Sequence, residues 1–346
     1  MPYTSPSLAL PHAVAPPPEA ADQGVPWHYG DPLREQRALV DGRGVVDQSH
    51  LAVLAVSGGD RHSWLHALTS AQLLDLSGSA SALILDPHGH VEYELHLIDD
   101  GVQNWIITES DAGEGLRDYL DRMRFAADVE VRDASSERAV VWVPRREVDP
   151  ERPTWLIPAD YAGTGTTPAG SDRGGDASRY IGTRPGLLVG SQVLVERDEL
   201  SVYLADAGEP VAGTWALEAL RVAAGVPRPG LETDHRTIPH EVGWVGPAVH
   251  LAKGCYRGQE TVARVHNMGR PPRRLVLLHL DGSDSHLPAH GDEVVFAERV
   301  VGTVGTAAQH FELGPVATAV LKRNVPDGAS VLVAGTPASV QWVVQA

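Results

Sequence analysis

Hydrophobic and polar positions alternate with two different periods along the first two thirds of the chain. The helix predicted over residues 113–125 places Leu116, Tyr119, Leu120 and Met123 on one face. Two apolar runs flank the turn-forming residues Asp86-Pro87-His88-Gly89 and predict a β-hairpin over residues 81–98. Short strands that alternate with helices indicate an α+β fold with split βαβ units.

The same patterns predict the remaining elements of this region. Helices are expected after Asp31, after the N-cap candidate Asp60, and over residues 213–224, where Gly225 ends the helix. Strands are expected before His50 and over residues 51–56, 102–108, 129–132, 139–143, 186–195 and 201–204.

Three further regions differ in character. Residues 1–30 are rich in Pro and Ala and predict a mobile tail, and residues 158–180 lack any apolar period and predict a flexible loop. From residue 271 to 346, short apolar runs separated by Gly, Pro, Asp and Asn predict a small β-barrel with strands at 275–280, 293–296, 300–304, 317–321 and 331–333. Residues 31–270 are therefore expected to form two interleaved α+β domains before this barrel.

Composition narrows the class of protein. The 346 residues are 42% hydrophobic and 21% charged, as in ordinary globular proteins. No apolar run approaches the roughly 18 residues of a membrane span, and the N-terminus lacks the features of a secretory signal. A single cysteine excludes an intramolecular disulfide, so a cytoplasmic location is expected. The net charge of −17 disfavours direct binding of nucleic acid or of membrane lipids.

One segment reverses this charge. Residues 251–274 contain one Lys, five Arg and one Glu, a local charge of +5. They include the run Lys253-Gly254-Cys255-Tyr256-Arg257-Gly258-Gln259-Glu260. In an extended segment Lys253 and Arg257 share the face of Cys255, and neighbouring cations favour the reactive thiolate. The alternative is a small buried cysteine beside a solvated row of arginines.

This run resembles the motif K-G-C-Y/F-x-G-Q-E of YgfZ-type proteins, which are relatives of the aminomethyltransferase (T-protein, GcvT) of the glycine cleavage system. The resemblance implies two ferredoxin-like domains and a C-terminal β-barrel arranged as a ring. It implies binding of tetrahydrofolate and a role as an accessory factor for iron–sulfur enzymes, including enzymes that modify tRNA. Fe–S enzymes or Fe–S assembly proteins would then be its partners.

The resemblance also implies folate contacts. Relatives carry a Gly-Gly-Ile-x-Asp-Asp pattern at the strand that here reads Gly89-His90-Val91-Glu92-Tyr93-Glu94, so Glu94 keeps a carboxylate and Tyr93 replaces the first Asp. Glu241 stands where relatives carry a Pro-x-Glu element. Arg264 and Arg270 of the basic segment are expected to help hold the folate, whose polyglutamate tail would suit a cationic surface.

The hypothesis is a folate-binding accessory protein in which Cys255 reacts, Lys253 and Arg257 tune it, and Gln259 and Glu260 orient the loop. A stable [4Fe–4S] cluster takes four thiolates, and this chain has one, so no stably bound cluster is expected. The alternatives are a tetrahydrofolate-dependent aminomethyl or one-carbon transferase and a non-catalytic interaction module. His88 and His90 are interpreted as polar residues of the hairpin, and no metal site is predicted.

Overall fold

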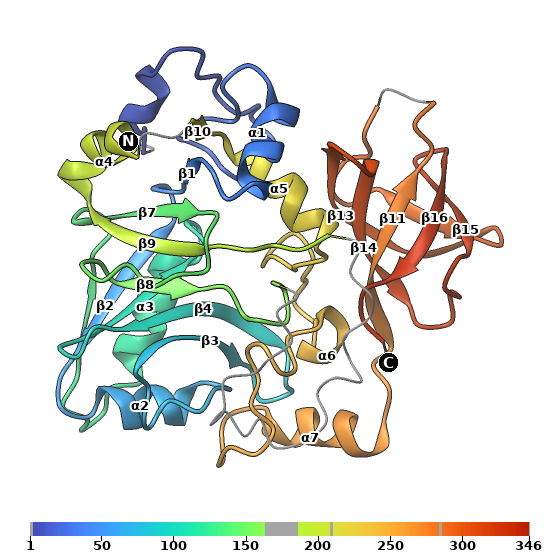
Figure 1. Cartoon of the computed structure of the whole chain (residues 1–346). Coiled ribbons are helices and arrows are strands. Elements are labelled where there is room, and N and C mark those ends of the chain that lie inside the picture. Colours follow the sequence, from blue (N-terminus) through green and yellow to red (C-terminus); the bar gives the residue numbers. More distant parts are fainter. Residues whose placement is uncertain (1–2, 163–185, 208–209, 284–285, 346) are drawn as a thin grey trace. The chain divides into compact units, whose positions relative to one another are not determined.

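The structure is a computed structural model, which describes residues 3–162, 186–207, 210–283 and 286–345 (Figure 1). Most of the loop predicted at 158–180 lies outside the described residues. The chain forms two compact units. The first unit comprises Met1–Ala82, Tyr93–Pro158 and Val189–Leu217, and the second comprises Leu83–Glu92, Ala159–Leu188 and Glu218–Ala346.

Two five-stranded sheets supply the framework of the first unit. One has the order β10 (Val211–Ala212), β1 (Val45–Asp47), β7 (Arg138–Val143), β9 (Ser191–Glu196) and β8 (Thr154–Leu156). The other has the order β3 (Gly78–Leu85), β4 (Val91–Asp99), β5 (Asn104–Thr108), β2 (Ala52–Ser57) and β6 (Glu130–Asp133). Strands β2 and β5 pair antiparallel, with Leu54 opposite Ile106, and are buried on both faces. Continuous apolar runs, rather than alternating ones, suit such central strands.

Helices accompany these sheets largely where the apolar spacing predicted them. They are the 3₁₀ helix η1 (Pro6–Ala9), α1 (Pro32–Val40), α2 (Arg61–Leu68), α3 (Gly113–Arg122), the 3₁₀ helix η3 (Arg197–Glu199) and α4 (Leu200–Asp206). In α3 the predicted face is buried through Leu116, Tyr119 and Leu120. Asp60 is the N-cap residue of α2, but its carboxylate accepts a hydrogen bond from the distant Asp128 backbone and none from the helix.

The prediction of a strand over residues 201–204 is wrong. These residues belong to α4, in which Leu200 and Leu204 are buried four residues apart while Val202 is 60% exposed. That spacing has the period of a helix. Four residues were too few to separate the two periods from sequence.

The N-terminal segment is bonded to the first unit, in contrast to the mobile tail that its composition predicted. The Ser5 and Ser7 hydroxyls both donate to the buried carboxylate of Asp47 at the end of β1. Asp22 accepts from His50 at 2.8 Å, with both side chains buried. Polar residues that satisfy buried partners therefore help to hold this segment in place.

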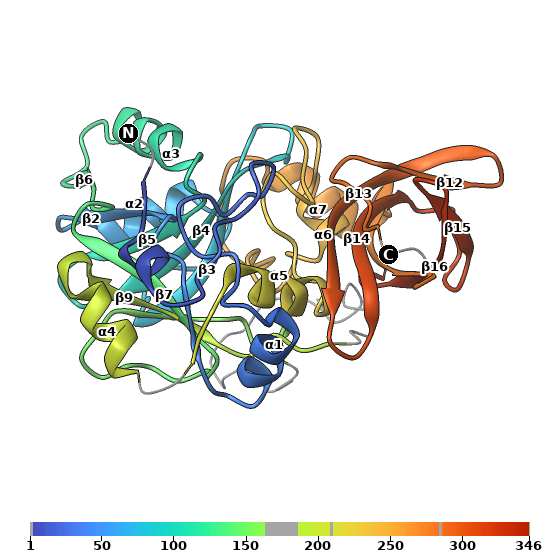
Figure 2. The ribbon, with the colours of Figure 1, turned by 90° about the horizontal axis from the view of Figure 1, so that it is seen from above.

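A closed six-stranded barrel dominates the second unit (Figure 2). Its strands follow the order β11 (Arg273–Leu280), β14 (Gly314–Lys322), β13 (Arg299–His310), β12 (Glu293–Phe296), β15 (Ser330–Val333) and β16 (Thr336–Trp342). Fourteen buried apolar side chains fill it, among them Leu278, Val304, Leu321 and Val340. The sequence predicted five of the strands and missed β16.

Three further helices lie between α4 and β11 in the chain. Helix α5 (Thr214–Ala223) was predicted, and its end is marked by Gly225 at a φ of +58°. Helices α6 (Pro239–Val242) and α7 (Gln259–Met268) were not predicted, and the segment around Cys255 that leads into α7 was expected to be extended. The α+β class with a C-terminal barrel is confirmed. Across the described residues, every helix is too short or too polar to span a bilayer.

Candidate functional site

The run Lys253–Glu260 forms a loop that leads into α7 in the second unit. Tyr256 anchors it, since its ring is 8% exposed and packs with Leu85, Trp244 and Val262 in a buried cluster. Burial raises the pKa of the Tyr256 hydroxyl well above its usual value. Gln259 donates from Nε2 to the Lys253 carbonyl at 3.2 Å and so ties the two ends of the loop together.

Two glycines let this loop pass against the tip of the β3–β4 hairpin. A Cβ on Gly258 would lie 2.6 Å from the Asp86 carbonyl, and a Cβ on Gly89 would lie 2.8 Å from the Thr261 side chain. Gly258 also has a φ of +81°, which favours glycine. Gly254, by contrast, has open space around it. The glycine after Arg257 is therefore required by backbone contact, whereas the one before Cys255 leaves the thiol accessible.

Cys255 and Lys253 occupy different environments. Cys255 is exposed, as the sequence predicted. Lys253 is 6% exposed, with its Nζ 5.1 Å from the centre of the Tyr256 ring, and desolvation lowers its pKa to about 8. The expectation that both side chains share one face is wrong because the segment is a turn-rich loop and not an extended strand.

Arg257 and Glu260 lie on the surface. Arg257 pairs with Glu92 of β4 at 3.1 Å, and both side chains are more than a third exposed. An exposed pair of this kind contributes little to stability, about 0–1 kcal/mol. Glu260 stands in the first turn of α7, where a carboxylate favours the helix dipole.

Most of the basic side chains of residues 251–274 interact with other residues of the second unit. Arg273 donates to both oxygens of Glu241, at 2.9 and 2.8 Å, and pairs with Asp234 at 2.7 Å. Arg274 is 4% exposed and stacks on Trp342 at 3.9 Å. Arg264 and Arg270 are exposed. Among the described residues, neither has a side-chain ion pair, so they alone remain as candidates for an anionic ligand.

Glu241 is placed differently from the folate contact that was expected of it. It is 1% exposed, and besides the Arg273 guanidinium it accepts from the Ile238 backbone amide at 3.2 Å. A carboxylate with both oxygens bonded inside the protein joins α6 to β11. Its geometry is that of a structural ion pair.

Glu94 lies on β4 in the first unit beside a set of side chains that the sequence analysis did not single out. His96 stacks on Trp155 with ring centres 3.7 Å apart and an angle of 7°. Its Nδ1 lies 2.7 Å from Gln192 Oε1, and Gln192 in turn donates from Nε2 to Gln48 at 3.0 Å. Gln192 Oε1 only accepts, so Nδ1 carries the proton. His96 is thereby fixed by contacts to β8 and β9.

The Glu94 carboxylate itself is left without a hydrogen bond among the described side chains. It is 15% exposed, and His96 Nε2 lies 3.7 Å from Glu94 Oε1. When His96 is neutral, its proton is on Nδ1, and Nε2 has none to donate to Glu94. A largely buried carboxylate with free acceptor capacity fits a ligand that brings N–H groups.

Aminomethyltransferases are similar to the chain in sequence and in fold. It is 27% identical over 340 residues to the aminomethyltransferase of Corynebacterium jeikeium, covering 88% of the chain and 86% of that protein. It is 25% identical over 334 residues to that of Streptomyces coelicolor, covering 85% and 82%. The crystal structure of glycine cleavage system aminomethyltransferase T from Bartonella henselae superposes with a TM-score of 0.71 at 17% identity, covering 95% of the chain and 93% of that protein. The chain has the aminomethyltransferase fold. No protein-family model matches it.

His88 and His90 interact with Asp86 inside the β3–β4 hairpin. His90 Nδ1 lies 2.9 Å from Asp86 Oδ2, and the amides of His88 and His90 both donate to Asp86 Oδ1 at 2.8 Å. These hydrogen bonds lower the pKa of Asp86 against the effect of its burial. The interpretation of both histidines as polar residues of the hairpin agrees with this geometry.

His96, which the sequence analysis did not single out, could have been found from the residue spacing along β4, the strand that carries Glu94. His96 follows Glu94 by two residues, so the two side chains share one face of β4. Trp155 and Gln192 come from strands far away in the sequence. Nothing in one sequence indicates which distant strands pack against that face.

Proposed function

We propose that the protein binds reduced folate through Glu94 and uses the exposed thiol of Cys255 to support iron–sulfur enzymes, including enzymes that modify tRNA. The aminomethyltransferase fold of the chain supports the first part, and the resemblance of the Cys255 loop to YgfZ-type proteins supports both. The observation that carries the folate proposal is the Glu94 carboxylate, which is 15% exposed and has His96 Nε2, at 3.7 Å, as its ion-pair partner but no hydrogen bond among the described residues.

The groups around Glu94 fit a pterin ring. A pterin offers an amino group and a ring N–H on one edge, and a carboxylate can accept from both. His96 is held rigidly near Glu94, since it stacks on Trp155 and is tethered to Gln192. Bound tetrahydrofolate would supply the one-carbon carrier.

The folate proposal is tested by titration with tetrahydrofolate under anaerobic conditions. Glu94→Gln keeps size and polarity but replaces one acceptor oxygen by an amide donor, so affinity should fall by about 1.5–3 kcal/mol, roughly 10- to 150-fold. Glu92→Gln is the matched control, because Glu92 lies two residues away and pairs only with exposed Arg257. Equal affinity of both variants and the wild type would remove Glu94 from the site.

The Cys255 proposal is tested by replacing the thiol. Since Cys255 is exposed, Cys255→Ser should keep the fold and the folate affinity, yet abolish support of iron–sulfur enzymes in cells that lack the native protein. Iodoacetamide should alkylate the folded wild type at this single cysteine. Full complementation by Cys255→Ser would show that the loop acts without its thiol.

The second candidate is a tetrahydrofolate-dependent aminomethyl or one-carbon transferase, which the two relatives named as aminomethyltransferases favour. An assay with tetrahydrofolate and an aminomethyl or formaldehyde donor separates the two candidates. Turnover that persists in Cys255→Ser and is lost in Glu94→Gln would establish the transferase. Folate binding without turnover supports the accessory role, and the absence of folate binding would leave only an interaction module.

A further inference from the structure

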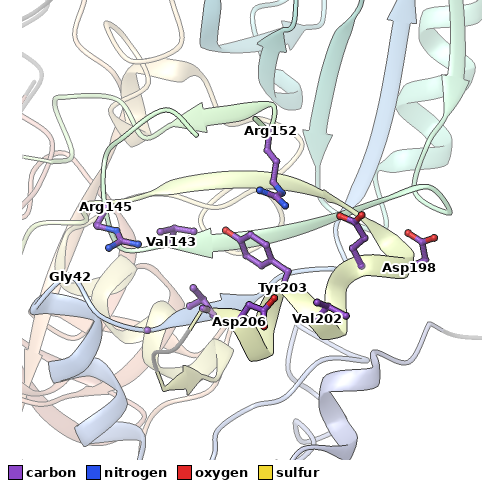
Figure 3. A pocket seen from close by; sticks show the side chains of 12 residues that line it. Gly42, Val143, Arg145, Arg152, Asp198, Val202, Tyr203 and Asp206 are labelled. Atoms are coloured by element: carbon purple, nitrogen blue, oxygen red, sulfur yellow. The ribbon is translucent and has the colours of Figure 1, made fainter. Parts of the chain in front are cut away.

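A pocket of about 640 Å³ opens in the first unit between the start of β1, the end of β7 and helix α4 (Figure 3). This volume is in the range of sites for small molecules, roughly 300–1,000 Å³. Its lining combines apolar side chains with several charged ones. It includes the side chains of Arg145, Arg152, Asp198, Glu199, Tyr203 and Asp206.

Three hydrogen-bond donors converge in this pocket. The Tyr203 ring lies between Arg145 and Arg152 in Figure 3, and the Arg152 guanidinium is 5.2 Å from the ring centre. Burial raises the pKa of Tyr203, aided by Asp149, so the hydroxyl stays protonated and able to donate. Two guanidinium groups and a phenol hydroxyl form a donor set that suits the oxygens of a carboxylate or phosphate.

These donors are weakly engaged by the protein itself. Arg152 reaches Asp149 and Glu151 only at 3.7 and 3.8 Å. In the described part of the chain, the Arg145 side chain has no ion pair and the Tyr203 hydroxyl no hydrogen bond. Arg145 is exposed, and it needs no movement of the chain to meet a ligand.

Carboxylates also line the pocket. Asp198 lies across Tyr203 from Arg145, and Glu199 is its neighbour in the chain. No ion pair involves these two carboxylates among the described residues. Because arginines and carboxylates both line the pocket, it is complementary to a molecule that carries both charges.

We propose that this pocket binds a small zwitterion, with its oxyanion between Arg145, Arg152 and Tyr203 and its ammonium group toward Asp198 and Glu199. The oxyanion is a carboxylate or a phosphate, which share this recognition chemistry. The proposal is independent of folate binding, because it involves neither Glu94 nor the Cys255 loop.

The test is titration calorimetry of the full-length protein with four probes. Phosphoethanolamine and β-alanine are zwitterions with phosphate and carboxylate ends, whereas inorganic phosphate and ethanolamine carry one charged end each. Saturable binding of either zwitterion, at least about tenfold tighter than either single-ended probe, supports the proposal, and the tighter zwitterion identifies the oxyanion. Failure of both zwitterions to bind, or equal binding of inorganic phosphate, would overturn it.

Variants assign the binding to this pocket. Arg145→Gln should weaken the bound zwitterion about tenfold or more, and Tyr203→Phe, which keeps the ring under Arg152, by roughly threefold to tenfold. Asp198→Asn should weaken it without affecting inorganic phosphate. Arg117→Gln is the control, since Arg117 is an exposed arginine of α3 paired with Asp118. Binding that survives both Arg145→Gln and Tyr203→Phe would place the ligand elsewhere and refute the proposal.

Discussion

At the scale of single residues, the Cys255 loop shows that side chains close together in the sequence can differ strongly in burial. Lys253, Cys255 and Arg257 alternate along the chain, and alternation predicted one shared face. The loop instead buries Lys253 over Tyr256 and leaves Cys255 and Arg257 exposed.

Burial of Lys253 predicts a specific pH dependence of stability. Its pKa is lowered from 10.5 to about 8 by desolvation, so between these values the unfolded chain binds more protons than the folded one. Stability from this group therefore rises as the pH increases from 8 to 10.5. Lys253→Met removes the effect. Between pH 7 and pH 10, the free energy of unfolding of the wild type should gain about 1–3 kcal/mol relative to the variant.

Urea unfolding of both proteins at a series of pH values measures this gain, and the comparison cancels the titration of other groups. Lys322→Met is the control, because Lys322 is exposed on β14. Parallel pH profiles of Lys253→Met and the wild type would show that the Lys253 ammonium group is solvated.

Arg273 provides a second prediction at this scale. It neutralises Glu241, which is 1% exposed, so Arg273→Met leaves a buried carboxylate without its cation. The free energy of unfolding should fall by about 3–5 kcal/mol at pH 7. Arg257→Met, which breaks an exposed pair, should cost no more than about 1 kcal/mol. Similar losses in the two variants would contradict the structural role assigned to Glu241.

The Asp234 carboxylate leads to a related prediction for stability at acidic pH. Hydrogen bonds from Arg273 hold the pKa of Asp234 well below its ordinary value of 3.8. This stabilisation is present above the unfolded pKa and is lost as the pH falls below about 4. The wild type should therefore lose more stability than Arg273→Met between pH 5 and pH 2, as measured by unfolding in urea.

At the scale of elements, the hairpin and α7 show what glycine contributes to the loop. Gly258 and Gly89 bring the β3–β4 tip and the start of α7 into backbone contact. Gly258→Ala should cost about 2–4 kcal/mol, because it adds a Cβ 2.6 Å from the Asp86 carbonyl at a φ of +81°. Gly254→Ala is the matched control within the same loop, with open space and no positive φ, and should change stability by less than about 0.5 kcal/mol.

Thermal unfolding measures both variants, and hydrogen exchange of the hairpin amides reports whether the loss is local. If Gly258→Ala were as stable as Gly254→Ala, the hairpin and α7 would have to separate easily, and the loop would not be positioned by this contact.

Long elements with a clear apolar period were predictable from sequence, and short ones were not. Helix α3 and the β3–β4 hairpin have such patterns, and both were located. Residues 201–204 and the start of α7 lack them. The Glu94 site shows the limit most clearly, because the strand carrying Glu94 and His96 was predicted while Trp155 and Gln192 depend on how two sheets pack. Glu241 was found by resemblance, yet only its hydrogen bonds show that it is structural.

At the scale of the whole molecule, charge is organised differently from its distribution along the sequence. The local excess of +5 in residues 251–274 suggested a cationic surface in a chain of net charge −17. Folding commits Arg257 and Arg273 to ion pairs and buries Arg274 on Trp342. A run of basic residues therefore contributes two exposed arginines without ion pairs in the described structure, which restricts any polyanion to a short contact.

The composition of the N-terminal segment predicts a mobile tail, whereas its hydrogen bonds attach it to the first unit. A mobile tail could be removed without cost. The structure instead uses Ser5 and Ser7 to satisfy Asp47, which is 1% exposed, and Asp22 to satisfy His50. Deletion of residues 1–24 would leave Asp47 and His50 without these partners, so the free energy of unfolding should fall by about 2–4 kcal/mol.

Substitutions distinguish the effect of losing these hydrogen bonds from the effect of deleting residues 1–24. The double variant Ser5→Ala/Ser7→Ala keeps the segment but removes both donors to Asp47, and it should reproduce at least about 1–2 kcal/mol of the loss in urea unfolding. In the deletion variant, Asp47→Asn should recover part of the lost stability, because a neutral amide is less costly to leave buried than a carboxylate. A deletion variant as stable as the full chain would mean that solvent satisfies Asp47 and that the segment is the mobile tail its Pro and Ala content suggested.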